Sequence, residues 1–95
     1  MTIKIELFYS PICPHCPEAK RALREVLEET DQEFHVDEVN VFSPEGLERA
    51  KKYGIISVPA IVIVDRHKIM GVPGKETLLR KIKHEIMSRE KEDES

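Results

Sequence analysis

The only two cysteines of the chain, Cys13 and Cys16, are separated by two residues in the run Cys-Pro-His-Cys. A disulfide needs Cα atoms about 4.4–6.8 Å apart, and two residues three apart on the first turn of a helix satisfy this in both redox states. The spacing therefore predicts a disulfide that opens and closes without refolding of the chain. The chemistry that it indicates is thiol-disulfide exchange.

Cys13 is the predicted nucleophile, because we expect it to lie where a helix begins. Unpaired N–H groups and the positive end of the helix dipole favour a thiolate there and lower the pKa of the thiol. Pro14 fits the first helical position and stiffens the turn. His15 adds an imidazole that can donate to the thiolate or, when protonated, pair with it. Cys16, further along the turn, is then the resolving cysteine.

Two other interpretations of the cysteine pair stay open. Two cysteines and a histidine form half of a zinc site, but the sequence has neither a second CxxC motif nor a following His-x₃₋₅-His pair. A purely structural disulfide is the other interpretation, although closing so short a loop restricts the unfolded chain very little. We therefore predict neither a metal nor any other cofactor.

Length, charge and hydropathy restrict the class of protein. The 95 residues suffice for one domain, and a net charge of −3 gives no reason to expect nucleic acid or an anionic membrane as a partner. The longest apolar run, residues 55–64, is interrupted by Ser57 and Pro59 and is too short to span a membrane. No signal peptide pattern precedes the first strand. We expect a cytoplasmic monomer.

The cysteines lie between a predicted strand and a predicted helix. Residues 3–9 alternate between apolar and polar side chains, which is typical of a strand. Apolar residues recur at helical spacing from Ala19 to Leu27, so we predict an amphipathic helix that begins at the CxxC run. Pro17 cannot donate a hydrogen bond to the carbonyl of Cys13, so we expect a slightly opened first turn.

The next two elements are a strand and a short helix. Residues 34–41 predict the strand, with a bulge or strand end near Glu38, because the apolar phase shifts within it. Ser43-Pro44 is typical of the start of a helix, and Gly54 can end it in the left-handed conformation.

The last third of the chain predicts a hairpin and a helix. Residues 58–64 and 68–70 predict antiparallel strands around a polar turn, and an apolar stripe over residues 78–87 predicts the final helix. The expected fold is therefore α/β in the order βαβαββα, a four-stranded mixed sheet flanked by three helices. We predict one domain over residues 1–87, followed by a charged, frayed tail over residues 88–95.

The element order, the position of the CxxC motif and the run Tyr-Gly-Ile-Ile-Ser-Val-Pro that ends at Pro59 together resemble the thioredoxin and glutaredoxin superfamily, over nearly the whole chain. The resemblance implies the thioredoxin fold and a cis peptide bond before Pro59, next to the disulfide. It also implies that the backbone of Val58 pairs with an extended substrate segment. On the same resemblance, Ile12 and Gly71 are candidate substrate-binding residues.

Departures from the family patterns bear on the subtype. Thioredoxins carry Trp before the first cysteine and Gly-Pro between the two, where this chain has Ile12 and Pro14-His15. The Pro-His dipeptide is similar to that of periplasmic disulfide oxidants, and the motif extended through Pro17 resembles archaeal protein disulfide oxidoreductases. The segment that begins at Gly71 resembles thioredoxins more than the glutathione-binding segment of glutaredoxins.

Thioredoxins also keep a buried Asp in the first strand and a Lys in the next strand, where this chain has Leu7 and Glu38. Glu38 is therefore a candidate proton acceptor for Cys16. The alternative is a solvated glutamate near a bulge, because glutamate is rarely buried. The other histidines, His35, His67 and His84, are predicted to be surface or packing residues.

The resemblance implies a protein dithiol-disulfide oxidoreductase that forms a mixed disulfide at Cys13 and has protein substrates and a reductase as partners. Two alternatives stay open: a glutaredoxin that uses glutathione, and a non-catalytic binding or metal-carrying module of the same fold. The sequence leaves the direction of electron flow open.

Overall fold

Strands and helices follow one another in the predicted order, βαβαββα. A computed structural model describes the backbone of residues 2–30 and 33–94, and the side chains of residues 3–30 and 33–87. The elements are β1 (Thr2–Tyr9), α1 (Cys16–Glu28), β2 (Glu33–Asn40), α2 (Pro44–Lys52), β3 (Ala60–Ile63), β4 (His67–Met70) and α3 (Lys75–Glu94).

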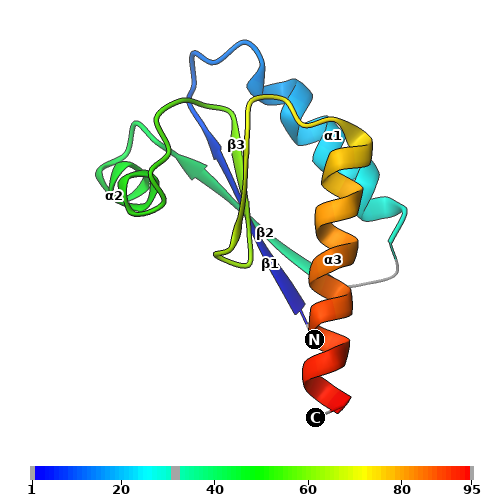
Figure 1. The fold of residues 1–95 in the computed structure, drawn as a ribbon. Coiled ribbons are helices and arrows are strands. Elements are labelled where there is room, and N and C mark those ends of the chain that lie inside the picture. The colour runs from blue at the N-terminus through cyan, green and yellow to red at the C-terminus, as the bar shows by residue number, and fades with distance from the viewer. Residues whose placement is uncertain (1, 31–32, 95) are drawn as a thin grey trace.

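The four strands form one mixed sheet in the order β2-β1-β3-β4. β1 pairs in parallel with β2, and the β1–β3 and β3–β4 pairs are antiparallel. Figure 1 shows α1 and α3 on one face of the sheet and α2 on the other. The predicted α/β fold, with a parallel first unit and a later hairpin, is confirmed.

Two apolar clusters hold these layers together. The larger one lies between the sheet and the α1/α3 layer and consists of Ile3, Ile5, Leu7, Ala19, Leu23, Val26, Ile61, Ile63, Ile69, Leu78 and Ile82. The smaller one faces α2 and consists of Phe8, Val39, Ala50, Ala60 and Val62. Because β1 and β3 contribute to both clusters, these two central strands are buried on both faces.

β2 contains no bulge and its pairing continues through Glu38 to Asn40, so neither the bulge nor the strand end predicted near Glu38 is observed. The parallel register between β1 and β2 runs without interruption from the Thr2–Glu33 pair to the Tyr9–Asn40 pair. The apolar phase shifts because Val36 and Val39 lie on opposite faces of a regular strand. Val36 lines a cavity against α1, whereas Val39 belongs to the cluster that faces α2.

Helix α1 begins at Cys16, three residues later than predicted. His15 is the N-cap residue, and its carbonyl accepts the Ala19 N–H at 3.2 Å. In a helix that began at Cys13, Pro17 would have to donate the first hydrogen bond to the Cys13 carbonyl, but proline has no N–H. At the second position of a helix that begins at Cys16, Pro17 needs no hydrogen-bond acceptor. Cys13 and Pro14 therefore lie in the connecting turn rather than in the helix.

Helix α2 begins as predicted. The Ser43 hydroxyl accepts the Gly46 N–H at 3.0 Å, and Pro44 occupies the first helical position. The predicted left-handed conformation of Gly54 is confirmed by its φ of +69°. Gly46 is required for a reason that the sequence does not indicate: a Cβ atom there would lie 1.9 Å from the Asn40 carbonyl oxygen.

Helix α3 continues to Glu94, so the backbone beyond residue 87 is helical where the sequence predicted a frayed tail. The division into a domain over residues 1–87 and a tail over residues 88–95 stays a prediction. Among the described residues, no helix combines the length and the apolar composition needed to cross a membrane.

A carboxylate is buried on the α2 face of the sheet. Glu6 of β1 is 1% exposed, and a charge in such a place needs partners. Arg49 of α2 forms an ion pair with it, and the Tyr53 hydroxyl donates to its Oε1 at 2.9 Å. The same hydroxyl contacts Asp65 in the β3–β4 turn. This polar cluster ties α2 and the segment before β3 to the sheet.

The cluster shifts two ionisation equilibria. Burial, followed by the hydrogen bonds to Asp65 and Glu6, raises the pKa of the Tyr53 hydroxyl far above its ordinary value. The hydrogen bond from Tyr53 lowers the pKa of Asp65. The folded protein therefore favours a neutral tyrosine beside an ionised aspartate.

We expect Tyr53→Phe to lower the free energy of unfolding by about 1–2 kcal/mol at neutral pH, because a hydrogen-bond donor to two carboxylates is lost. The raised pKa of Tyr53 contributes to the free energy of unfolding at neutral pH, and this contribution is lost as the pH rises above about 10. The lowered Asp65 pKa contributes stability that is lost as the pH falls below about 4. Both pH dependences should weaken in the variant.

Urea denaturation over a pH series measures these effects, with Tyr9→Phe as the matched control. Equal stability of Tyr53→Phe and wild type at every pH would contradict the proposed role of the cluster.

Candidate redox site

Three loops meet at one end of the sheet. In the register, Phe8 near the end of β1 lies opposite Ala60 at the start of β3, and Ala60 lies opposite Met70 at the end of β4. The CxxC turn, the segment that enters β3 and the segment that leaves β4 therefore lie side by side, as Figure 1 shows. Strand pairing thus places these three loops together although they are far apart in the sequence.

The peptide bond between Val58 and Pro59 is cis, as the resemblance to the superfamily implied. Pro59 is buried, and its carbonyl accepts the Gly71 N–H at 2.8 Å. Gly71 has a φ of +78°, in the left-handed region. The segment after β4 is thus fixed directly to the residue before β3.

Cys13 and Cys16 form a disulfide with a Cα–Cα distance of 5.5 Å, within the range that a disulfide requires. Cys16 is only 7% exposed, whereas Cys13 is partly exposed in the turn before the helix. The Cys13 N–H donates to the Ser10 carbonyl at 3.2 Å, which holds the turn on the end of β1. A reagent in solvent therefore reaches Cys13 more readily than Cys16.

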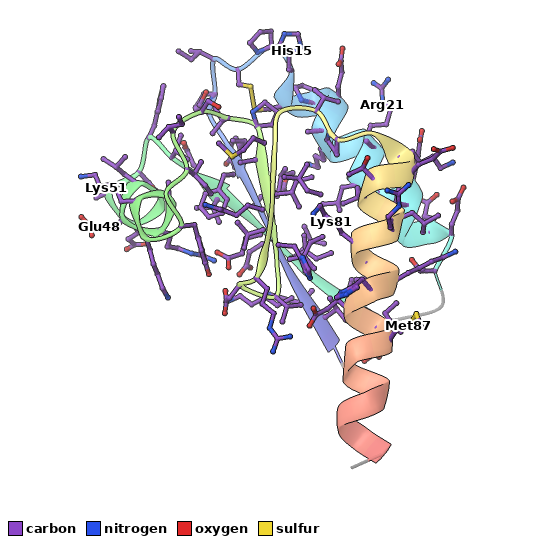
Figure 2. All side chains as sticks on the ribbon, viewed as in Figure 1. His15, Arg21, Glu48, Lys51, Lys81 and Met87 are labelled. Atoms are coloured by element: carbon purple, nitrogen blue, oxygen red, sulfur yellow. A yellow bond between two sulfur atoms is a disulfide. The ribbon has the colours of Figure 1, made fainter. Side chains whose placement is uncertain are left out.

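The two residues between the cysteines are exposed. Figure 2 shows His15 at the outer edge of the loop, directed away from the sheet. Its Nδ1 lies 4.0 Å from Glu18 Oε2 in the first turn of α1. In the disulfide form the imidazole thus has a carboxylate as its charged neighbour.

A cavity of about 360 Å³ adjoins the disulfide. Its lining residues come from β1, the CxxC turn, α1 and β2: Leu7, Tyr9, Ser10, Pro11, Cys13, Cys16, Pro17, Lys20 and Glu38. Glu38 and both cysteines therefore line the same cavity.

Glu38 pairs with Lys20 across this cavity. It lies opposite Leu7 in the β1–β2 register, and its Oε1 is 2.8 Å from Lys20 Nζ. Both side chains are 46% exposed, so Glu38 is in contact with solvent and lines the cavity at once. The sequence gives no reason to select Lys20 among the charged residues of α1 except its spacing of four from Cys16.

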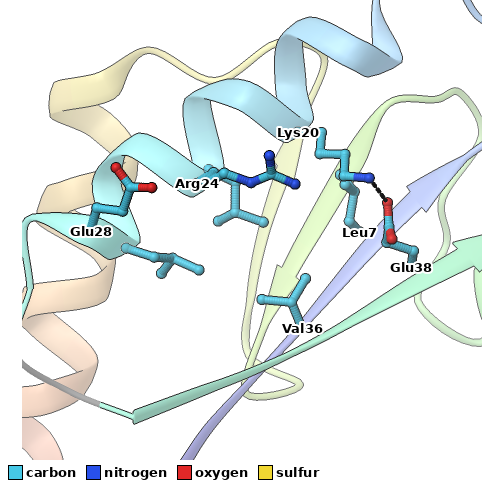
Figure 3. Close-up of a pocket in the computed structure, with 8 residues that line it drawn as sticks. Leu7, Lys20, Arg24, Glu28, Val36 and Glu38 are labelled. Atoms are coloured by element: carbon cyan, nitrogen blue, oxygen red, sulfur yellow. Dashed lines mark ion pairs between the residues drawn. The ribbon is translucent and has the colours of Figure 1, made fainter.

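A second cavity, of about 310 Å³, continues between α1 and β2 and shares Leu7, Lys20 and Glu38 with the first. Figure 3 shows the ion pair at one end of it, with Arg24 and Glu28 further along α1. The Lys20–Glu38 pair therefore lies where the two cavities meet.

Exposed apolar side chains surround the loops at this end. Ile12 is 77% exposed and Ile56 is 92% exposed. Ile56 also lines a groove of about 560 Å³ with Val41, Phe42, Leu47, Ala50, Ile55, Ser57 and Val58. Apolar surface near a redox-active pair is suited to contact with another polypeptide.

The described residues contain no group of three His, Cys, Asp or Glu side chains that could hold a metal ion. His35 pairs with Asp37 on the surface at 3.1 Å. His67 lies 3.3 Å from the buried Glu85, and its ring packs edge-on against His84 at 5.7 Å between centroids. These three histidines are surface and packing residues, as predicted.

Comparisons with known sequences agree with this geometry. The family described as "Thioredoxin domain" matches residues 1–83. The chain is 45% identical over 84 residues to a thioredoxin of Methanocaldococcus jannaschii, an alignment that covers 88% of this chain and 96% of the relative. It is 39% identical to a probable thioredoxin of Archaeoglobus fulgidus, over 85% of this chain and 90% of the relative.

Solved structures show the same fold at low sequence identity. A protein of a malaria parasite superposes with a TM-score of 0.70 at 17% identity, over 88% of this chain and 97% of that chain. Thioredoxin-2, a component of the protein secretion machinery of the malaria parasite, also gives a TM-score of 0.70 at 17% identity, over 87% of this chain and 82% of that chain.

We expect Gly71→Ala to lower the free energy of unfolding by about 1–2 kcal/mol, because a side chain is unfavourable at this positive φ. The cost is conformational, since a Cβ atom at this position would have no neighbour within 4 Å. Gly74→Ala is the matched control, because its nearest neighbour, Thr77 Oγ1, would lie at an ordinary 3.7 Å. Urea denaturation compares them; an equal loss in both variants would refute this explanation.

Proposed function

Because the chain belongs to the thioredoxin family of thiol-disulfide oxidoreductases, we propose that Cys13 is its nucleophile and Cys16 its resolving cysteine. The observation that carries this assignment is the difference in exposure, since Cys16 is 7% exposed and Cys13 is accessible in the turn. An incoming disulfide has to approach one of the two sulfurs in line, and Cys13 is the less buried of the two residues.

The reaction then has two exchanges. The Cys13 thiolate attacks a substrate disulfide, forms a mixed disulfide and releases one substrate sulfur as a thiolate. Cys16 loses its proton and attacks the Cys13 sulfur, which releases the second substrate sulfur. The substrate gains two electrons, the Cys13–Cys16 disulfide forms, and a reductase restores the dithiol.

We propose that the substrate segment lies beside Val58 and Pro59, with Ile12 and Gly71 at the edges of its site. The position of these residues on the three loops around the disulfide supports this. An extended segment would pair with the backbone of Val58, as in strand addition, and the exposed Ile12 would cover its apolar side chains.

Two residues are proposed to tune the cysteines, with Pro14 stiffening the turn between them. Cys13 precedes the first residue of α1, so the helix dipole stabilises its thiolate only weakly and a further group is needed. The imidazole of His15 would supply this stabilisation. Glu18 competes for the same imidazole. Glu38 would accept the Cys16 proton, since both residues line one cavity.

We propose protein disulfides as the substrates and a cytoplasmic monomer as the working form. The apolar groove of about 560 Å³ and the exposed Ile56 support a macromolecular substrate over a small one. Glutathione is the alternative reductant; it would support turnover without a protein reductase.

Cys16→Ser should accumulate a stable mixed disulfide with a protein substrate such as insulin, because the resolving sulfur is absent. Cys13→Ser should accumulate little, because its remaining sulfur is buried. Non-reducing electrophoresis and intact mass spectrometry detect the adduct. If Cys13→Ser trapped the substrate and Cys16→Ser did not, the two roles would have to be exchanged.

His15→Gly should raise the pKa of the Cys13 thiol and lower the redox potential together, because the thiolate loses its imidazole partner. We expect the wild-type potential to lie above the value of about −270 mV typical of thioredoxin. Thiolate absorbance against pH and equilibration in a glutathione buffer measure the two quantities. Glu18→Gln is the control, because it removes the carboxylate beside the His15 imidazole, and the redox potential of this variant should not fall. An unchanged Cys13 pKa in His15→Gly would exclude a role for His15.

A further inference from the structure

We propose that Lys20 is a further functional residue of this site, which compensates the negative charge that moves from Glu38 to the Cys16 sulfur during resolution. The inference rests on the proposed roles of Cys16 and Glu38 and adds the cation that these roles require.

The position of Lys20 follows from helical spacing. Cys16 is the first residue of α1 and Lys20 is four residues further along, so the two lie on the same face of the helix, with Cβ atoms about 5–6 Å apart. Both line the cavity of about 360 Å³ that adjoins the disulfide. Lys20 and Cys16 therefore border the same cavity from one helix.

The charges around this cavity explain why a cation is needed. An ionised Glu38 without a partner would oppose a thiolate on Cys16, because like charges disfavour each other. Lys20 Nζ lies 2.8 Å from Glu38 Oε1 and cancels that charge. The other titratable group in this cavity besides the cysteines is Tyr9 from β1, while Arg24 and Glu28 of α1 line only the adjoining cavity.

The proton transfer then conserves charge within the cavity. Before it, Lys20 is positive, Glu38 is negative and the Cys16 thiol is neutral. The proton moves from the Cys16 sulfur to the Glu38 carboxylate, so the negative charge moves to the sulfur while Lys20 stays positive. The thiolate attacks Cys13, the bond from Cys13 to the substrate sulfur breaks, and Glu38 returns the proton to solvent.

The second step of the reaction isolates this effect. Reduced protein mixed with 5,5′-dithiobis(2-nitrobenzoate) releases one coloured thiolate when Cys13 attacks and a second when Cys16 resolves the mixed disulfide. The first step depends on reagent concentration and the second does not, so stopped-flow absorbance separates them. The rate of the second step is followed over a pH series.

We expect Lys20→Met to slow the second step about three- to ten-fold at neutral pH and to shift its pH midpoint upward, with the first step little changed. Lys20→Arg should retain the wild-type midpoint, because it keeps the charge. Arg24→Met is the matched control, one turn further along the same helix, and should behave as wild type. Lys20 is 46% exposed, so thermal unfolding should show that all these variants fold.

The double variant Lys20→Met/Glu38→Gln should resolve more slowly than Lys20→Met alone, because it also lacks the proposed proton acceptor. A Lys20→Met variant that matches Arg24→Met in both rate and midpoint would overturn the role of Lys20. Failure of the proposed function would be distinct: the wild type would lack the second step, or Glu38→Gln would leave its rate unchanged.

Discussion

The hydrogen bonding of β1 in the middle of the sheet is the constraint on which the rest of the structure depends. β1 pairs in parallel with β2 and antiparallel with β3, so its carboxyl end meets the start of β3 and, through β3, the end of β4. The disulfide, the cis Val58–Pro59 bond and Gly71 are near one another for this reason. A shift of one residue in this register would move every β1 side chain to the opposite face and separate the site from its core.

The two faces of β1 carry different polar arrangements. On the α2 face, the buried Glu6 is bound by Arg49 and Tyr53, which fixes the segment that enters β3. On the α1 face, the strand contributes the apolar Leu7, and the charges at the cavity come from Glu38 of β2 and Lys20 of α1. The buried carboxylate thus contributes to stability, while the partly exposed pair that lines the disulfide cavity is in contact with solvent.

Patterns local in the sequence predicted most of the fold. Alternation in β1, the helical stripe of α1, the Ser43 cap and the left-handed Gly54 are all confirmed, because each depends on residues within one or two turns. The predicted start of α1 at Cys13 was three residues too early, since the effect of Pro17 was underestimated. The bulge near Glu38 was wrong because the shift of phase reflects two apolar residues on opposite faces of a regular strand, Val36 on the α1 side and Val39 on the α2 side.

The sequence by itself determined the redox chemistry, because two cysteines three residues apart form a disulfide that the local chain geometry alone permits. It also determined the order of the elements and, with the resemblance, the cis Val58–Pro59 bond. Only the tertiary structure decided that Lys20 joins Glu38 in lining the cavity beside Cys16. Lys20 and Glu38 are eighteen residues apart and come together solely because α1 packs over the β1–β2 register. Such contacts depend on strand order and helix placement, which no local pattern encodes.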